Sequence, residues 1–436
     1  MTTVDADTPT TTRTGQVLAW GLWDWGSSAF NAVATTFVFT VYITGKSFDN
    51  GGVDPSAQLG WALGLAGIVV LLIAPVTGQR SDSSGRRKLW LAINTAVVVV
   101  CLGLMYFVQA APEFLVLGLL LLAVGTVFFE VAGVNYNAML AQVSTPRSVG
   151  RVSGFGWGMG YIGGIVLLLI VYFGFIKPEV GLFGVTGENG LAVRVSMVIA
   201  AVWFALFALP VLFAVPEHRI TPQDEKRRVG FFQSYAILGR DVARLWKTSR
   251  QTVYFLLASA VFRDGLTGVF TFGGVLAAGT FGFSPGDVIV FAIAANVVAG
   301  ISTISVGVLD DRLGPKPVIL TSLIGLVIAG SLVFILHAGG TTVFWIFGLL
   351  LCLFVGPAQS ASRTFLARLI PPGREGEVFG LYATTGRAAT FIAPTMWSLF
   401  ITIGGAQYWG ILGIVLVLAV GLALLIPVKA RQDRIS

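Results

Sequence analysis

The sequence reads G-Q-R-S-D-S-S-G-R-R-K from Gly78 to Lys88 and G-V-L-D-D-R-L-G-P-K-P from Gly307 to Pro317. Four residues agree at an offset of 229 positions, namely Gly78, Asp82, Gly85 and Arg87 with Gly307, Asp311, Gly314 and Lys316. A second match, at an offset of 226, pairs P-R-S-V-G-R-V-S-G from Pro146 with P-G-R-E-G-E-V-F-G from Pro372. Two matches at nearly one offset predict two homologous halves, a plan typical of secondary transporters.

The composition places these halves in a membrane. Of the 436 residues, 55% are hydrophobic and only 11% are charged, whereas soluble domains carry about 25% charged residues. A soluble protein of this length could not bury so much apolar surface, because burial is limited by surface-to-volume scaling. The 54 glycines fit close packing of helices in lipid. We therefore expect an integral membrane protein.

Apolar runs long enough to cross the hydrocarbon core, about 20 residues each, predict the helices. We expect twelve, over residues 17–44, 57–78, 89–110, 113–140, 152–176, 192–215, 252–281, 286–308, 318–338, 341–366, 377–403 and 407–428. The predicted fold class is an all-α membrane protein with twelve transmembrane helices in two pseudo-symmetric six-helix bundles. The domains would be a cytoplasmic tail (1–15), a first bundle (16–215), a linker (216–250), a second bundle (251–428) and a cytoplasmic tail (429–436).

The distribution of Lys and Arg predicts the orientation. With both termini in the cytoplasm, 22 basic residues fall on the inner side and only Lys46 and Lys177 on the outer side. This one-sided distribution follows the positive-inside rule. It also accounts for the net charge of +7 through an anionic inner leaflet, so no nucleic-acid partner is implied. We expect a multi-pass protein of the cell membrane, present as a monomer.

The linker carries an amphipathic pattern. Basic residues, namely Arg240, Arg244 and Lys247, fall between apolar residues that recur at spacings of four and three. The apolar residues are Phe231, Tyr235, Leu238, Val242 and Leu245. This pattern predicts a helix lying on the inner membrane surface. A connector that rests on the headgroups accounts for it without a sensing role.

The repeated loop suggests a conformational latch. Glycines allow a tight turn between two close helices, an aspartate can cap the positive end of a neighbouring helix, and arginines reach carboxylates or carbonyls at helix ends. The candidate latch residues are Gly78, Asp82, Gly85, Arg86, Arg87, Asp311, Gly314, Lys316 and Arg363. The alternative is a loop that serves only to hold positive charge inside.

The sequence gives no support for a disulfide framework, a metal site, nucleotide binding or catalysis. Cys101 and Cys352 sit inside apolar runs, and the two histidines lie near predicted loops, so neither a disulfide framework nor metal-ligand spacing is present. There is no nucleotide-binding loop and no catalytic triad. We expect no cofactor, no metal, no catalytic residue and no enzymatic activity.

The loop from Gly78 to Lys88 resembles the signature loop between helices 2 and 3 of the major facilitator superfamily, and the copy at Gly307 resembles its second-half version. A narrower resemblance is to the autophagy-linked vacuole-effluxer family. Three segments carry it: W-G-L-W-D-W-G-S-S-A-F (Trp20–Phe30), R-V-S-G-F-G-W-G-M-G-Y-I-G-G (Arg151–Gly164) and Q-S-A-S-R-T-F-L-A-R-L-I-P-P-G-R-E-G-E-V-F-G (Gln359–Gly380).

The resemblance implies export of amino acids, and it implies that helices 1, 4, 7 and 10 line the central cavity. One departure is informative. Drug–proton antiporters of the superfamily carry a glycine-proline motif in helix 5, but here Tyr161 stands in place of the proline. The sequence therefore disfavours the interpretation as a drug–proton antiporter. The glycines Gly156, Gly160 and Gly164 share one helix face and predict a close-packing surface.

Charged residues inside predicted helices mark the candidate site, because intramembrane charge is costly and usually faces an interior cavity. The candidates for substrate binding or proton coupling are Asp24, Glu130, Arg263, Asp264, Gln359 and Arg387. Most fall on the helices that the resemblance places around the cavity. Arg263 and Asp264 are neighbours and so point about 100° apart on a helix.

The functional interpretation is alternating access coupled to protons. Asp264 or Glu130 would bind and release a proton, and Arg387 or Arg263 would bind a substrate carboxylate. The substrate would be a small polar or zwitterionic solute such as an amino acid, most simply exported. Permanent interhelical ion pairs are the structural alternative. An exporter of lipophilic or drug-like compounds and a non-transporting membrane scaffold or sensor are the functional alternatives.

Overall fold

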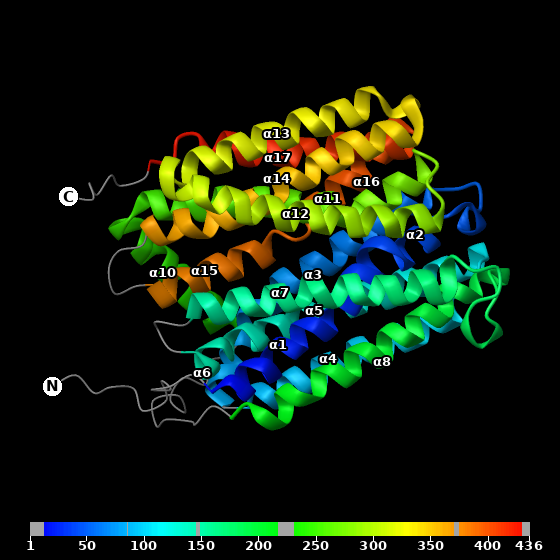
Figure 1. Ribbon diagram of the computed structural model, residues 1–436. Coiled ribbons are helices and arrows are strands. Elements are labelled where there is room, and N and C mark those ends of the chain that lie inside the picture. Colours follow the sequence, from blue (N-terminus) through cyan, green and yellow to red (C-terminus); the bar gives the residue numbers. More distant parts are fainter. Residues whose placement is uncertain (1–12, 85, 145–148, 217–230, 370–374, 430–436) are drawn as a thin grey trace. The chain divides into compact units, whose positions relative to one another are not determined.

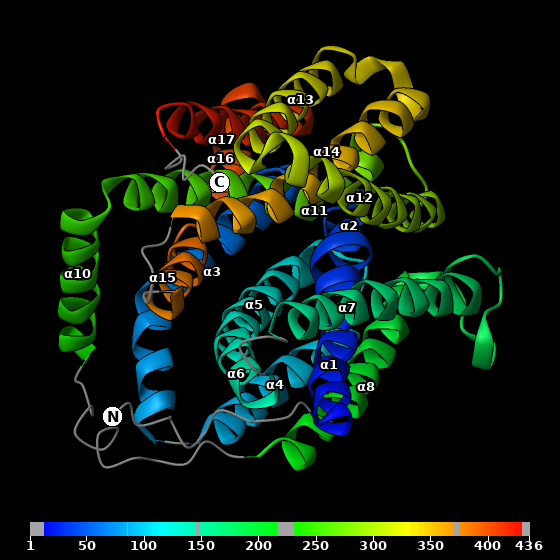
Figure 2. The same cartoon turned by 60° about the vertical axis from the view of Figure 1, so that its left-hand side comes forward.

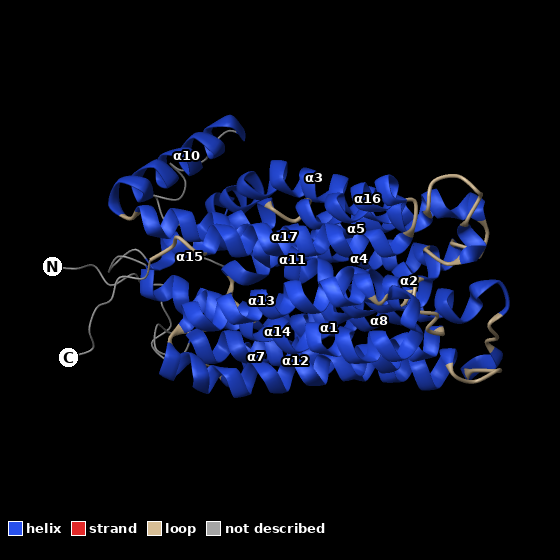
Figure 3. Ribbon diagram, turned by 90° about the horizontal axis from the view of Figure 1, so that it is seen from above, coloured by secondary structure: helices blue, strands red, loops and turns tan. Residues whose placement is uncertain are grey.

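The structure is a computed structural model that describes residues 13–84, 86–144, 149–216, 231–369 and 375–429. Every element named in these residues is a helix, apart from one isolated antiparallel bridge between Val180 and Thr186 (Figure 3). Eleven helices in this part of the chain are long and apolar enough to cross a membrane. The predicted all-α membrane fold is confirmed.

Internal contacts divide the chain into two compact units. Unit 1 comprises Met1–Tyr42 and Ile73–Tyr235, and unit 2 comprises Ile43–Leu72 and Ala236–Ser436. The long helix α3, Pro55–Ser84, therefore contributes its first part to unit 2 and its remainder to unit 1. The domain boundaries drawn from the sequence stay a prediction.

Unit 1 is built around the first helix. α1 packs against α7 and α8, and α4 packs against α5 and α8 (Figure 2). The bounds are α1 Thr14–Ser28, α4 Arg87–Leu104, α5 Leu115–Ala138, α6 Leu140–Val143, α7 Val149–Val171 and α8 Leu191–Ala214. Glycine permits these close approaches: a Cβ at Gly163 would lie 2.6 Å from the carbonyl oxygen of Trp25, so only a residue without a side chain fits there.

The first membrane span changes its winding midway. After α1 the chain forms a π-helix over Ala29–Phe37, and the short helix α2, Phe39–Ile43, completes the span. The hydroxyls of Thr35 and Thr36 both donate to the carbonyl oxygen of Asn31, at 2.8 and 2.7 Å. Wide turns of this kind are rare and occur frequently at functional sites.

Unit 2 holds the remaining helices. Here α13 packs against α14 and α17, and α11 packs against α15 and α17 (Figure 2). The bounds are α10 Phe231–Thr248, α11 Arg250–Gly279, α12 Pro285–Leu313, α13 Pro315–Ile335, α14 Gly340–Leu369, α15 Glu375–Ala388, α16 Ile392–Gly404 and α17 Gly410–Leu425. The helix predicted in the linker is confirmed as α10; its position on the membrane surface stays a prediction.

The helix predicted over 377–403 is not continuous. It is broken into α15 and α16, which follow one another in the orange part of the chain in Figure 1. Pro394 explains the break, because proline has no N–H to donate and its ring clashes with the carbonyl four residues earlier. The sequence interpretation missed the break because only three residues separate α15 from α16.

The predicted signature loops are shorter than expected. α3 continues to Ser84 and α12 continues to Leu313, so that Gly78, Asp82 and Asp311 lie in helices and not in turns. The chain turns sharply at Gly314, whose φ of +86° is a conformation that favours glycine. Polar residues in the last turns of these two helices made the predicted boundaries too early.

Within unit 2, the first part of α3 packs tightly on α16. Cβ atoms added at Gly60 and Gly67 would lie 2.7 Å from the carbonyl oxygen of Pro394 and from the nitrogen of Phe391, respectively. Two hydrogen bonds join the same helices: Nε1 of Trp397 donates to the carbonyl of Ser56 at 3.2 Å, and the hydroxyl of Ser398 donates to that of Ala57 at 2.7 Å.

Candidate functional site

Polar side chains follow one another along the first helix of unit 1. Asp24 and Thr35 are half-buried and Asn31 is exposed, although all three lie inside a membrane-spanning segment. Polar groups within such helices face a protein interior or a water-filled path more readily than lipid. The sequence analysis named Asp24 for its charge and missed Asn31, because a neutral amide gives a weaker signal.

The carboxylate of Asp24 is held by a tyrosine on another helix. The hydroxyl of Tyr136, on α5, donates to Oδ2 of Asp24 at 2.8 Å. The Tyr136 ring stacks on Trp20 and on Trp23, with ring centroids 4.5 and 4.3 Å apart. Nε1 of Trp20 also donates to the carbonyl of Tyr136 at 3.2 Å, while Nε1 of Trp23 donates to the hydroxyl of Thr95 at 3.1 Å. These contacts fix the position of the carboxylate.

The glycine face of α7 closes over the same carboxylate. A Cβ at Gly156 would lie 2.7 Å from Oδ2 of Asp24 and 2.7 Å from the ring of Trp20. Further along, Gly160 lies against the backbone of Asp24. The close-packing surface predicted for the α7 glycines is therefore confirmed, and its partner is the segment of α1 that carries Asp24.

No cation neutralises this carboxylate within the described part of unit 1, where the hydroxyl of Tyr136 is the side chain that hydrogen-bonds to it. Asp24 is half-buried as a residue. Glu130 lies on the same helix as Tyr136, six residues earlier, and is also half-buried. Unit 1 thus places two acids on neighbouring membrane helices.

In unit 2, Asp264 has a structural partner that the sequence could not reveal. Its side chain is 4% exposed, and its Oδ2 accepts a hydrogen bond of 2.5 Å from the backbone N–H of Ala393. Ala393 is the second residue of α16, whose first N–H groups have no acceptor within their own helix. The carboxyl oxygen lies at the positive end of the helix dipole, where an acceptor is favourable. Asp264 therefore caps α16 at the break created by Pro394.

Arg263 points to a different helix from its neighbour. Its Nη1 donates to the carbonyl of Tyr382, on α15, at 3.2 Å, and its guanidinium lies 4.1 Å from the centroid of that ring. A Cβ at Gly386 would lie 2.7 Å from the same nitrogen, so glycine makes room for the guanidinium. The Tyr382 hydroxyl is fixed in turn by Ser362 at 2.6 Å. Tyr382 is a further site residue that the sequence analysis did not single out.

The remaining candidates are dispersed over unit 2. On α14, Gln359 is half-buried and Arg363 is exposed; Arg387 is half-buried in the last turn of α15. Thr267 lies one turn beyond Arg263 and is exposed, with its hydroxyl donating to the carbonyl of Arg263 at 3.1 Å. The polar face of α11 is therefore the one that carries Arg263, and Asp264 faces away from it.

Basic residues of the repeated loops contact helix ends within their own units. Nη1 of Arg87 donates to the carbonyl of Ala138 at 3.4 Å, at the end of α5. In the second copy, Nζ of Lys316 donates to the carbonyls of Ile426 and Val428, at 2.8 and 2.6 Å, just beyond the end of α17. Positive groups are favourable at these negative helix ends.

These contacts agree with the expectation that basic loop residues reach helix carbonyls, while the latch itself stays a prediction. Arg86 is exposed immediately before α4. Gly85 and the side chains of Asp82 and Asp311 lie outside the described residues, as do the surroundings of Gly78.

Comparison with known proteins gives a consistent picture. The family described as "Vacuole effluxer Atg22 like" matches residues 141–435. The uncharacterized MFS-type transporter YxiO of Bacillus subtilis (strain 168) is 24% identical over 424 residues, which cover 96% of both chains. Autophagy-related protein 22 of Cryptococcus neoformans var. neoformans serotype D (strain B-3501A) is 26% identical over 300 residues, covering 65% of this chain and 53% of that protein.

Solved structures show the same fold at low sequence identity. The crystal structure of a D-xylose–proton symporter matches with a TM-score of 0.69 and 13% identity, covering 95% of this chain and 97% of that one. The architecture of this chain is therefore the twelve-helix arrangement of major facilitator transporters, with α15 and α16 together in the place of one helix.

Proposed function

Because the chain belongs to the vacuole effluxer Atg22-like family of MFS-type membrane transporters, we propose that it exports a small zwitterionic solute, such as an amino acid, in exchange for protons. Transport would proceed by alternating access. The protein would act as a monomer in the cell membrane, with both termini in the cytoplasm. The observation that carries the proposal is the Asp24 carboxylate, half-buried in a membrane helix and held by Tyr136.

Asp24 suits an exchange between a proton and an ammonium group. A carboxylate without a neighbouring cation favours its neutral form when it is removed from water, and it binds an ammonium ion through a charge-assisted hydrogen bond when it is ionised. The two ligands would compete for the same oxygen atoms. Such competition gives the difference in binding between loaded and protonated carriers on which coupled transport depends.

Arg263, in unit 2, suits the binding of a substrate carboxylate. The guanidinium presents five donors in a planar fork, and the bond to the Tyr382 carbonyl engages Nη1. The fork then retains donors for a substrate carboxylate. Stacking on Tyr382 holds the group in place, which lowers the conformational cost of binding.

We propose structural or supporting roles for the other acidic and polar side chains. Asp264 holds the start of α16 through Ala393, so we assign proton exchange to Asp24 with Glu130 as a second acceptor on the neighbouring helix. Gln359 and Arg387, on α14 and α15, would contribute polar contacts to the substrate. Arg363 and the basic loop residues would stabilise one of the two transport states.

Counterflow in proteoliposomes tests the proposal. Liposomes preloaded with a panel of unlabelled amino acids would receive labelled leucine or tyrosine, with wild type compared with Asp24→Asn and with Asp49→Asn, an exposed loop acid. We expect exchange in wild type and Asp49→Asn. In Asp24→Asn we expect proton-driven transport to fall at least tenfold. Normal proton-driven transport by Asp24→Asn would overturn the role of Asp24, and absence of exchange for every amino acid in folded wild type would overturn the substrate class.

A further inference from the structure

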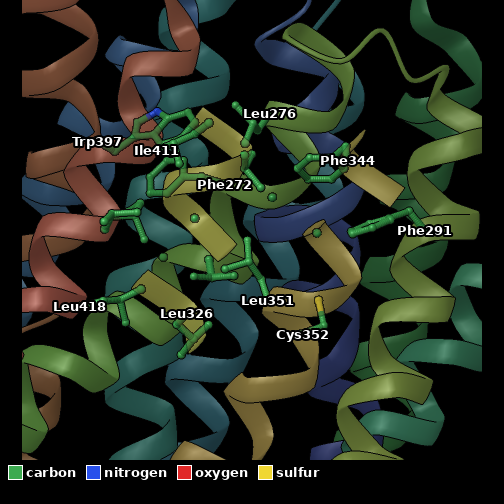
Figure 4. Close-up of a pocket in the computed structure, with 18 residues that line it drawn as sticks. Phe272, Leu276, Phe291, Leu326, Phe344, Leu351, Cys352, Trp397, Ile411 and Leu418 are labelled. Carbon is green, nitrogen blue, oxygen red and sulfur yellow. The ribbon is translucent and has the colours of Figure 1, made fainter. Parts of the chain in front are cut away.

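Unit 2 contains a partly open apolar cavity of about 50 Å³ that is lined by helices of this unit. Its walls come from six helices. In Figure 4, Phe272 and Leu276 stand on α11, Phe291 on α12, Leu326 on α13, Leu351 and Cys352 on α14, Trp397 on α16 and Leu418 on α17. Phe272 and Trp397 stack with their centroids 4.5 Å apart and form one wall.

The chemistry of the lining excludes water and charge as occupants. A buried water needs two to four polar partners, but the residues that line the cavity are aliphatic and aromatic side chains and glycines, with the Cys352 thiol and the Trp397 indole as exceptions. The indole N–H already donates to the carbonyl of Ser56. Since one water takes roughly 10–15 Å³ on the same measure of volume, the cavity has room for several heavy atoms.

The cavity lies away from the face that carries Arg263. Gly268, Phe272 and Leu276 line it and recur every four residues along α11. At about 100° per residue, Gly268 points roughly 140° away from Arg263, and Phe272 points roughly 180° away. Thr267, the exposed polar residue of α11, follows the Arg263 face. The cavity is therefore separate from the proposed substrate site.

We propose that this cavity is a binding site for small, uncharged, apolar molecules of about the size of one aromatic ring. Two aromatic side chains in its wall favour a flat ring, which packs against Phe272 and Trp397 in offset or edge-to-face contacts. Filling an empty apolar space restores the dispersion contacts that its walls lack. The ligand stabilises Trp397, and with it the contact between α16 and the first part of α3 through the Ser56 carbonyl.

Cysteine reactivity tests the proposal with an internal control. Cys352 lines the cavity, whereas Cys101 lies in unit 1, and both are 4% exposed. The reaction of each thiol with methylmercury is followed by peptide mass spectrometry, in the full chain reconstituted in lipid nanodiscs, with and without toluene. At ten times its Kd, toluene should slow the reaction of Cys352 about tenfold, because only the empty fraction reacts, and should leave Cys101 within twofold.

A side chain that fills the cavity should abolish the protection of Cys352 by toluene. Gly273 lines the cavity, and a Cβ added there meets no atom within 4 Å, so the Gly273→Leu side chain can begin in open space. Gly300→Leu, also on a glycine with open space in unit 2 but outside the cavity lining, is the matched control. Toluene should protect Cys352 in the Gly300→Leu protein and not in the Gly273→Leu protein. Equal protection in both variants, or equal protection of the two cysteines, would overturn the proposal.

A second readout does not depend on thiol chemistry. Iodobenzene quenches tryptophan fluorescence on contact, and Trp397 is the indole in the cavity wall. A saturable part of the quenching should be present in wild type and absent in Trp397→Phe and Gly273→Leu. If wild type and both variants show only the same linear quenching from lipid-dissolved iodobenzene, the cavity binds no such ligand. Val269→Phe, which also fills the cavity, serves if Gly273→Leu fails to fold.

Discussion

Replacement of Asp264 separates its structural role from a role in proton transfer. Asp264→Ala removes the acceptor for the N–H of Ala393 and leaves the start of α16 without its cap. Leaving a buried donor without its acceptor costs about 1–3 kcal/mol, and loss of a helix cap about 0.5–2 kcal/mol. Because the site is buried and water cannot replace the lost acceptor, we expect a loss of about 2–3 kcal/mol in the free energy of unfolding.

Asp264→Asn should behave differently from Asp264→Ala. The asparagine side chain keeps an oxygen that can accept the same bond, so its cost should be less than half as large. For a folding unit of 150–250 residues, 1 kcal/mol corresponds to about 2–4 °C in Tm. The Ala variant should therefore lose about 4–12 °C in Tm and the Asn variant less than half as much.

Thermal unfolding in detergent, followed by the loss of the monodisperse peak in size-exclusion chromatography, measures these shifts. Transport by Asp264→Asn should remain measurable, since the helix start is still capped. A Tm for Asp264→Ala within 1 °C of wild type would refute the capping role. Proton-driven transport abolished in Asp264→Asn, with Tm unchanged, would place proton exchange at Asp264 instead of Asp24.

Two further predictions concern contacts that are specific to one unit. Gly156→Ala should reduce transport at least tenfold and lower the free energy of unfolding by about 1–3 kcal/mol, because its Cβ would lie 2.7 Å from Oδ2 of Asp24. The control Gly158→Ala, with open space around its Cβ, should leave both the transport rate and the Tm unchanged. Equal effects of the two substitutions would show that the Asp24 contact is unimportant. Lys316→Met should lower the Tm by about 4–8 °C, because the two bonds to the carbonyls of Ile426 and Val428 are each worth about 1 kcal/mol. Lys316→Arg should lower it by less. A Lys316→Met protein with the wild-type Tm would contradict this.

The sequence predicts the fold well because each membrane helix can be identified from a continuous stretch of neighbouring residues. Each span is a long apolar run, and the repeated motifs relate the first half of the sequence to the second. The orientation inferred from the basic residues stays a prediction. The helix break at Pro394 was the principal miss. A proline inside an apolar run is tolerated in many membrane helices, so the residue alone does not say whether the helix bends or stops.

The candidate site is predicted less completely. Asp24, Arg263 and Asp264 stand out because a charge in an apolar run is costly, but the groups that hold them are neutral. The hydroxyl of Tyr136 is 112 residues from Asp24 along the chain, and the partner of Asp264 is a backbone N–H, which no side-chain pattern records. The N-Y-N triplet around Tyr136 was the one local signal that could have pointed to it.

The most direct test of the central claim is counterflow of labelled leucine or tyrosine in proteoliposomes, with a proton gradient imposed and then removed. If the chain exports zwitterionic amino acids in exchange for protons, wild type exchanges them in both conditions and the gradient drives net transport. Asp24→Asn would keep some exchange and lose the response to the gradient. Folded wild-type protein that exchanges no amino acid, or an Asp24→Asn protein that responds fully to the gradient, would contradict the account.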